Sequence, residues 1–223
     1  EEFHHGRVSP FTLGKLRDAL GRPTSAMVNI LLCHHHPLRH PEHEIDEMKD
    51  GQSLLDLLSE PGMGDWLVVH GHMHHPRLAY AQGGSGTPVV LSAGSLCATL
   101  PARLNGRAAN QFYIVTFPLD DIQQYGLVGQ IEAWDWTFGK GMSRSTVRSG
   151  VAWGAGFGHR RNAAQVAGDI ARVVTRKDQE FIKWAELLEA LPYLKYTLLV
   201  DLQQVAARLE GRGLKVSPAN WSE

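Results

Sequence analysis

Two short apolar runs, each leading into histidines and a proline, constrain the fold of this sequence more than any other feature. The first, residues 27–33 (MVNILLC), leads into three histidines and Pro37. The second, residues 66–69 (WLVV), leads into four histidines and Pro76. Continuous apolar runs of this length are typical of strands buried on both faces of a parallel sheet. Because ligands bind at the carboxyl ends of such strands, the pattern predicts a metal site at the end of a sheet.

The segments around these runs alternate between helix and strand. Residues 12–20 carry an apolar stripe at helical spacing, and residues 53–59 (SLLDLLS) predict a second helix with Ser53 as its N-cap. Residues 38–51 are charged and predict a surface loop, and residues 65–69 predict the second strand. The order helix, strand, loop, helix, strand indicates an α/β layered fold with parallel strands.

The middle of the chain has a different pattern. Residues 78–82 and 88–92 flank a glycine-rich turn and predict a β-hairpin. Residues 110–117 predict a further strand, and residues 129–137 alternate in polarity and are predicted to pair with residues 145–157. This section is therefore expected to be β-rich and antiparallel.

The C-terminal part is expected to be helical. Apolar residues recur at three-to-four spacing over residues 162–188, and residues 198–209 (LLVDLQQVAARL) form a last amphipathic segment. The change of pattern near residue 160 divides the chain into a domain at residues 1–160 and a helical extension at residues 161–223. The apolar face of this extension either packs on the rest of the chain or holds a protein partner.

The composition excludes several classes of protein. The 223 residues are 43% hydrophobic and 20% charged, and the net charge is −1, so no basic field favours nucleic acid. No apolar run reaches the ~18 residues of a membrane span. The two cysteines give no disulfide framework, which favours a reducing compartment, and the cytoplasm is expected. Because the sequence starts at Glu1 without an initiator methionine, we expect a piece of a longer protein.

The histidines themselves suggest which side chains bind a metal. On an extended segment, His72 and His74 point the same way, and Gly71 lets the backbone turn as it leaves the strand. His35 arrives from the neighbouring strand end if the two strands are adjacent. Imidazoles without a thiolate pattern suit Zn, Fe, Mn or Ni. The alternative is a histidine-rich surface loop that binds no metal in the cell. The flanking histidines are expected to point away from the metal, and these are His34, His36, His70 and His75.

Two motifs resemble those of a known family. Gly71-His72-Met73-His74 resembles the Gly-His-x-His signature of the calcineurin-like metallophosphoesterases, and His35-His36-Pro37 resembles their upstream His-x-Pro element. The resemblance covers residues 8–140 and corresponds to the family's C-terminal half. It implies a β-sandwich flanked by helices, with two divalent metal ions at its edge.

The resemblance also implies roles for individual residues. His35 and His72 would bind one metal ion, and His74 would bind the other. The reaction would be hydrolysis of a phosphomonoester or phosphodiester, with nucleotides among the substrates. His75 and Arg77 follow the signature closely and, like Arg39, are candidates for binding the phosphate of the substrate, although a solvated loop explains them equally well.

Half of the family's ligands are missing from the sequence. The family's N-terminal motifs Asp-x-His and Gly-Asn-His are absent, and the Gly-Asp pairs Gly64-Asp65 and Gly168-Asp169 lie in other contexts. Without a bridging carboxylate, two adjacent divalent ions would repel each other. A longer enzyme, a second chain that supplies ligands, or a scaffold that has lost catalysis would each explain this. The rival functions are therefore a protein-interaction module and a binder of a single metal ion.

Overall fold

The chain is a mixed α/β protein, as the sequence predicts. It contains two sheets and six α-helices in the residues that the computed structural model describes. The chain divides into two compact units, unit 1 at residues 1–114 with 133–153, and unit 2 at residues 115–132 with 154–223. The described residues are 5–21, 27–38, 47–81, 86–100, 104, 108–146, 148, 150–177 and 181–216.

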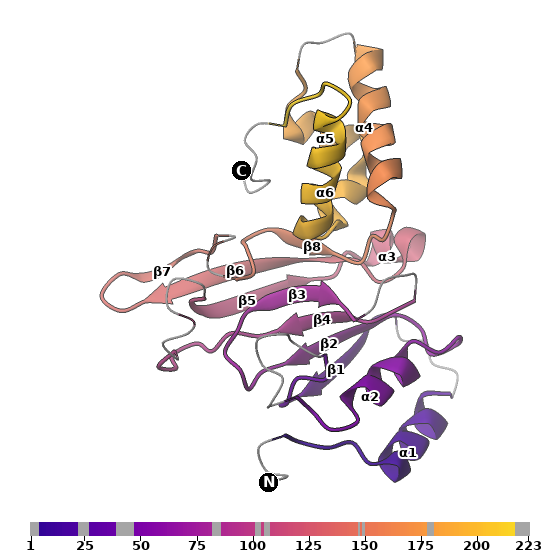
Figure 1. The fold of residues 1–223 in the computed structure, drawn as a ribbon, viewed down its shortest axis with the longest axis vertical. Helices are drawn as coiled ribbons and strands as arrows, with labels where there is room; N and C mark the ends of the chain where they lie inside the picture. Colours follow the sequence, from indigo (N-terminus) through magenta and orange to yellow (C-terminus); the bar gives the residue numbers. More distant parts are fainter. Residues whose placement is uncertain are drawn as a thin grey trace. The chain divides into compact units, whose positions relative to one another are not determined.

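The first sheet lies in unit 1 and has the strand order β1-β2-β4-β3 (Figure 1). β1 (Asn29–Cys33), β2 (Trp66–His70) and β4 (Val89–Ser92) run parallel, and β3 (Arg77–Tyr80) is antiparallel to β4. The parallel pairing of the two apolar runs and the hairpin are thus confirmed. The register opposes Cys33 to His70, so the residues that follow β1 and β2 leave the sheet side by side.

β1 is not buried on both faces, contrary to the prediction. It is the terminal strand of its sheet, and Ile30 and Leu32 are 47% and 74% exposed. Their neighbours Leu31 and Cys33 face the helices and are partly buried against the core. The apolar run correctly predicted a strand, but its place in the sheet depends on which strands pair, and no local pattern encodes that.

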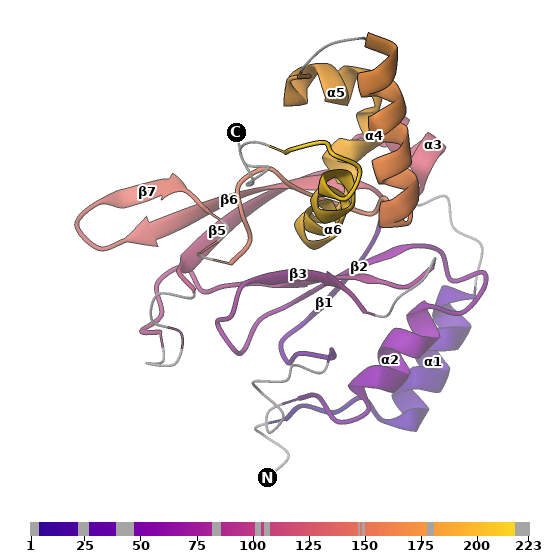
Figure 2. The same cartoon turned by 45° about the horizontal axis from the view of Figure 1, so that its top comes forward.

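Two helices, α1 (Pro10–Leu20) and α2 (Gly51–Leu58), lie side by side against one face of this sheet (Figure 2). α1 begins two residues earlier than predicted, because Pro10 follows Ser9, whose Oγ accepts a hydrogen bond from the Thr12 N–H at 3.2 Å.

α2 also begins earlier than predicted, and Ser53 is not its N-cap. The helix starts at Gly51, where a Cβ would lie 2.8 Å from the Pro37 backbone, so only glycine fits this close approach. Leu55 and Leu58 of α2 pack on Val68 and Val90 of the sheet and form the core of unit 1.

The second sheet contains β5 (Asn110–Thr116), β6 (Gly129–Thr137), β7 (Gly141–Arg144) and β8 (Ala155–Phe157). β6 pairs with β7 near its C-terminal end and with β8 near its N-terminal end. Besides β5, the partners of β6 are therefore two short strands, and not the continuous segment 145–157 that we predicted. A short helix that we did not predict, α3 (Leu119–Tyr125), precedes β6.

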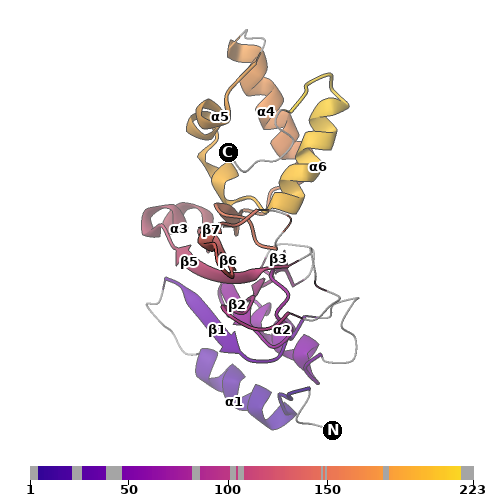
Figure 3. The ribbon, with the colours of Figure 1, turned by 90° about the vertical axis from the view of Figure 1, so that its left-hand side faces the viewer.

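Unit 2 is mainly helical, as predicted, and groups α4 (Ala163–Lys177), α5 (Trp184–Ala190) and α6 (Leu199–Glu210) around one core (Figure 3). A 3-10 helix, η3 (Pro192–Tyr196), connects α5 to α6. Strand β8 belongs to the same unit, whose second segment starts at residue 154. The predicted apolar stripes form this core, with Val166, Ile170, Leu187, Leu194, Leu202, Val205 and Leu209 buried.

Among the described residues, no helix combines the length and the apolar character that crossing a bilayer requires.

Candidate metal site

Three histidines meet where β1 and β2 end. The ligand atoms of His34, His35 and His72 lie within 4.8 Å of one another. The Gly71 N–H donates to the His34 carbonyl at 3.1 Å, which extends the pairing of the two strands by one step. His72 Nδ1 lies 3.1 Å from His34 Nε2, so one of these rings carries a proton between them. We call these three residues the histidine trio.

A strained turn brings His72 into the trio. The Met73 N–H donates to the Gly71 carbonyl at 3.0 Å, which closes a three-residue γ-turn around His72. His72 has a φ of 74°, which belongs to the rare and strained form of this turn. His74 also has a positive φ, 54°. Two residues of this kind, separated only by Met73, have to be held in place by the structure around them.

The extended geometry predicted for His72 and His74 is therefore wrong. Because both residues are left-handed, the rule that side chains two apart point the same way does not apply to them. In the described part of the chain the trio contains His35 and His72 of the predicted ligands, and His74 is outside it. His34 takes the third place, although alternation predicted that it points away. The strand ends at Cys33, so the alternation does not extend to His34 and His35.

His35 has the properties of a metal ligand. Its Nδ1 is buried and has no hydrogen-bond partner among the described residues. Gly6 packs on the ring, and a Cβ there would lie 2.4 Å from His35 Cδ2. Burial, followed by the nearby rings of His72 and His34, lowers the pKa of His35 below its usual value. The imidazole is thus neutral near pH 7, which is the form that binds metals.

The donor set fits a divalent transition metal. Three imidazoles, with water or a substrate in the remaining position, are a known ligand set of catalytic zinc sites. A structural zinc site would instead close its coordination with a fourth protein ligand, and within the described ranges the cluster has three members.

Two further histidines lie behind the trio. His36 and His70 are buried, and their ring centroids are 6.1 Å apart. Burial lowers the pKa of His70 to about 4, so this ring is neutral. Its Nδ1 lies 3.2 Å from the Gly71 carbonyl, which can only accept, so this nitrogen carries the proton.

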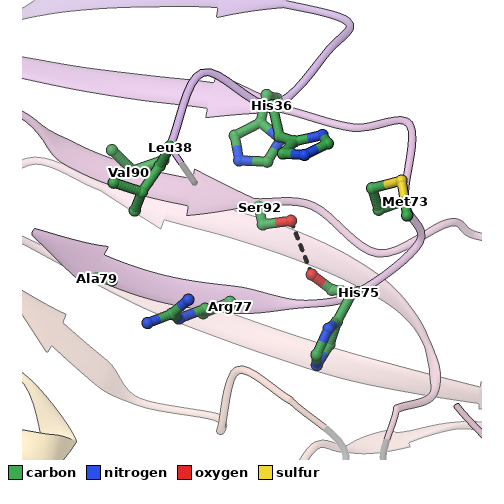
Figure 4. Close-up of a pocket in the computed structure, with 9 residues that line it drawn as sticks. His36, Leu38, Met73, His75, Arg77, Ala79, Val90 and Ser92 are labelled. Atoms are coloured by element: carbon green, nitrogen blue, oxygen red, sulfur yellow. Dashed lines mark hydrogen bonds between the residues drawn. The ribbon is translucent and has the colours of Figure 1, made fainter. Parts of the chain in front are cut away.

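These two rings line a cavity of about 30 Å³, room for one or two water molecules, together with His75 and Arg77 (Figure 4). Ser92 closes its wall and donates to the His75 carbonyl at 2.7 Å. Two of the residues predicted to bind phosphate thus lie at one cavity, with Arg77 exposed to solvent. Arg39, the third, lies outside the described residues.

Comparison with known families finds a match in unit 2. A family of winged helix-turn-helix domains, described as calcineurin-associated, matches residues 155–210. This segment contains β8, α4, α5, η3 and α6, which all lie in unit 2. The match covers well under half of the chain and describes only this part of it. No curated protein matches the chain.

The family assignment made from residues 8–140 is contradicted by this comparison. The matching family is the winged helix, and no metallophosphoesterase family matches the chain. Motifs of three or four residues are short enough to occur without the family's structure. The geometry behind the assignment also differs, because His72 and His74 do not lie on an extended segment.

Proposed function

We propose that the chain binds a divalent transition-metal ion through His34, His35 and His72 and uses it to hydrolyse phosphate esters. The observation that carries the proposal is the trio itself, in which three imidazole nitrogens lie within 4.8 Å at the carboxyl ends of two parallel strands. The buried His35 Nδ1 supports it, because a buried nitrogen without a partner loses its interactions with water and gains nothing in return.

The residues around the trio suit an anionic substrate. A bound ion would supply positive charge at the phosphoryl oxygens and lower the pKa of a coordinated water. Neutral imidazoles leave the charge of the ion uncompensated, so the site attracts phosphate. Arg77, which is exposed and lines the neighbouring cavity, would bind a phosphate oxygen. The substrate class is a phosphomonoester or phosphodiester, nucleotides included.

We also propose a second metal ion next to the first. His74 would be its ligand, and it would need a bridging carboxylate that the trio does not provide. The association with calcineurin in the name of the matched family is compatible with phosphoester chemistry. Both cysteines are free, which supports the reducing cytoplasm as the proposed location.

The test is metal binding followed by turnover. We expect the whole chain to bind Co²⁺ and to hydrolyse bis-p-nitrophenyl phosphate when Mn²⁺ is added. His34→Ala or His72→Ala should weaken Co²⁺ binding by at least about 10-fold, because each removes one of three ligands. His74→Ala should keep the first ion and lose any second one.

His159→Phe is the matched control, because it removes a histidine of unit 2. Wild-type Co²⁺ binding that is no tighter than that of His34→Ala would refute the site. Metal binding without hydrolysis would support the metal site and refute the proposed hydrolytic activity.

A second candidate function is a protein-interaction module, and the winged helix favours it. On α6, the exposed positions include Val200, Gln203, Gln204 and Ala207, and the charges of this helix nearly cancel. Duplex nucleic acid requires a basic face, so a protein partner suits this helix better. A salt-dependent affinity for duplex DNA, measured by fluorescence anisotropy, would contradict this reading.

A further inference from the structure

The strained turn around His72 needs an anchor on its C-terminal side. On its N-terminal side the turn continues from β2, whose pairing with β1 and β4 fixes it. On the other side it ends at Pro76, which is buried directly before β3. Left-handed backbone is strained at a residue other than glycine. Since His72 and His74 both adopt it, contacts on both sides of the turn have to hold this shape, and Pro76 supplies those on the C-terminal side.

Two glycines from distant loops hold Pro76 between them. A Cβ at Gly94 would lie 2.9 Å from Pro76 Cγ, and a Cβ at Gly150 would lie 2.4 Å from Pro76 Cβ. No side chain fits at either position without displacing the proline. We refer to Gly94, Pro76 and Gly150 as the proline clamp.

One buried side chain ties both sides of the clamp together. Gln111 of β5 is 2% exposed. Its Nε2 donates to the Val151 carbonyl at 3.1 Å, and its Oε1 accepts from the Val151 N–H at 3.3 Å, which fixes the residue next to Gly150. Its backbone N–H donates to the Ser95 carbonyl at 2.9 Å, next to Gly94.

Tyr113 completes the link to Gly94. Its hydroxyl donates to Gln111 Oε1 at 2.8 Å and accepts from the Gly94 N–H at 2.8 Å. Burial raises the pKa of Tyr113, so the hydroxyl keeps the proton that it donates. Gln111 Nε2 also donates to Asp135 Oδ1 at 2.8 Å, which anchors the amide to β6. A fully hydrogen-bonded buried network of this kind makes a rigid support.

We propose that Gln111 and Tyr113 are positioning residues, which act through the proline clamp to hold His72 against His34 and His35. The reason for such positioning rests on the proposed function, because a metal site needs its ligands fixed before the ion arrives. The contacts that link Gln111 to His72 do not depend on that function. Neither residue touches the trio, and each acts only through Gly94, Gly150 and Pro76.

The test compares single variants of the whole chain without and with metal. Tyr113→Phe removes the hydroxyl and keeps the ring, and Gly94→Ala places a Cβ against Pro76. Gly14→Ala in α1 is the matched control, because a Cβ there meets no atom within 4 Å. The metal-free readout is the imidazole ¹⁵N spectrum of His72 and His34, which reports the 3.1 Å contact between the rings. The second readout is the Co²⁺ affinity with its visible absorption bands.

We expect both clamp variants to shift the His72 and His34 signals and to weaken Co²⁺ binding by about 10-fold, while Gly14→Ala changes neither. Leu55→Ala, which destabilises the core of unit 1, should leave the signals of the folded protein unchanged, which separates positioning from stability. Unchanged His72 and His34 signals in folded Tyr113→Phe would overturn the inference, whether or not Gly94→Ala folds. If the signals shift but wild-type protein binds no Co²⁺, the positioning stands and the proposed metal site fails.

Discussion

His35 is partly exposed and His159 is buried, and their surroundings prepare them for different roles. His35 has a buried nitrogen without a hydrogen-bond partner among the described residues and lies in the trio. His159 stacks on Tyr193 in unit 2, with ring centroids 4.2 Å apart and an angle of 22° between the planes. The environment lowers the pKa of both rings, so both are neutral at pH 7. The His35 imidazole has a nitrogen that could bind a metal, whereas the His159 imidazole packs as an aromatic ring.

The stability of unit 2 should depend on pH through His159. Burial, assisted by the positive charge of Arg161, lowers its pKa from 6.5 to about 4. The unfolded chain therefore takes up a proton as the pH falls below 6.5, while the folded chain does not. The stabilisation is complete above pH 6.5 and is lost as the pH falls towards 4.

His159→Phe keeps the stacking and removes this titration. The loss of unfolding free energy between pH 7 and pH 4.5 should be smaller in the variant by on the order of 1–2 kcal/mol. Urea unfolding at the two pH values measures it. Equal losses in wild type and variant would show that His159 is not the titrating group.

At the scale of elements, β1 is an edge strand without the usual protection. Natural edges carry charges, prolines or bulges that prevent further pairing, and β1 (NILLC) has none of these. Its outer edge pairs with no strand of the described residues, and Ile30 and Leu32 expose apolar side chains beside it. The strand that leads to His34 and His35 thus also has an unprotected edge.

Leu32→Lys should reduce self-association of the chain. A charge on the exposed face of an edge strand opposes pairing with a second copy and removes little burial, because Leu32 is already exposed. Sedimentation velocity at rising concentration measures the effect. Phe138→Lys is the matched control, since Phe138 is exposed just beyond the end of β6. If both variants reduce association equally, general hydrophobicity and not the β1 edge is responsible.

At the scale of the whole molecule, the described residues include a hydrophobic cluster in each unit. One lies in unit 1 around Leu55 and Leu58, and the other lies in unit 2 around Val205 and Leu194. The winged-helix match falls entirely within unit 2, and the histidine trio falls entirely within unit 1. The candidate metal chemistry and the matched family thus belong to different units.

Core mutations should therefore act within their own unit. Val205→Ala should increase amide hydrogen exchange in α4, α5 and α6, and Leu55→Ala should increase it in α2 and β2, each by destabilising a fully buried contact. Hydrogen exchange followed by mass spectrometry resolves the two regions. Equal loss of protection in both units from either variant would contradict this independence and indicate one cooperative core.

The sequence by itself determined most of the elements of this protein. The runs at 27–33 and 66–69 become parallel strands, and the periodic segments become α1, α4 and α6, because apolar periodicity is a local property that burial enforces. It also determined the neighbourhood of the site. Histidines that follow two adjacent parallel strands have to meet at one end of the sheet.

Only the tertiary structure decided which histidines meet. His34 enters the trio and His74 does not, because the backbone beyond the strands turns through left-handed residues that have no sequence period. The edge position of β1 depends on the order of strands in the sheet, and the place of Gln111 depends on partners 24 to 40 residues away. Patterns along the chain record which way a residue faces within its own element. They do not record which side chains, distant in sequence, lie close together in space, and the candidate site consists of such side chains.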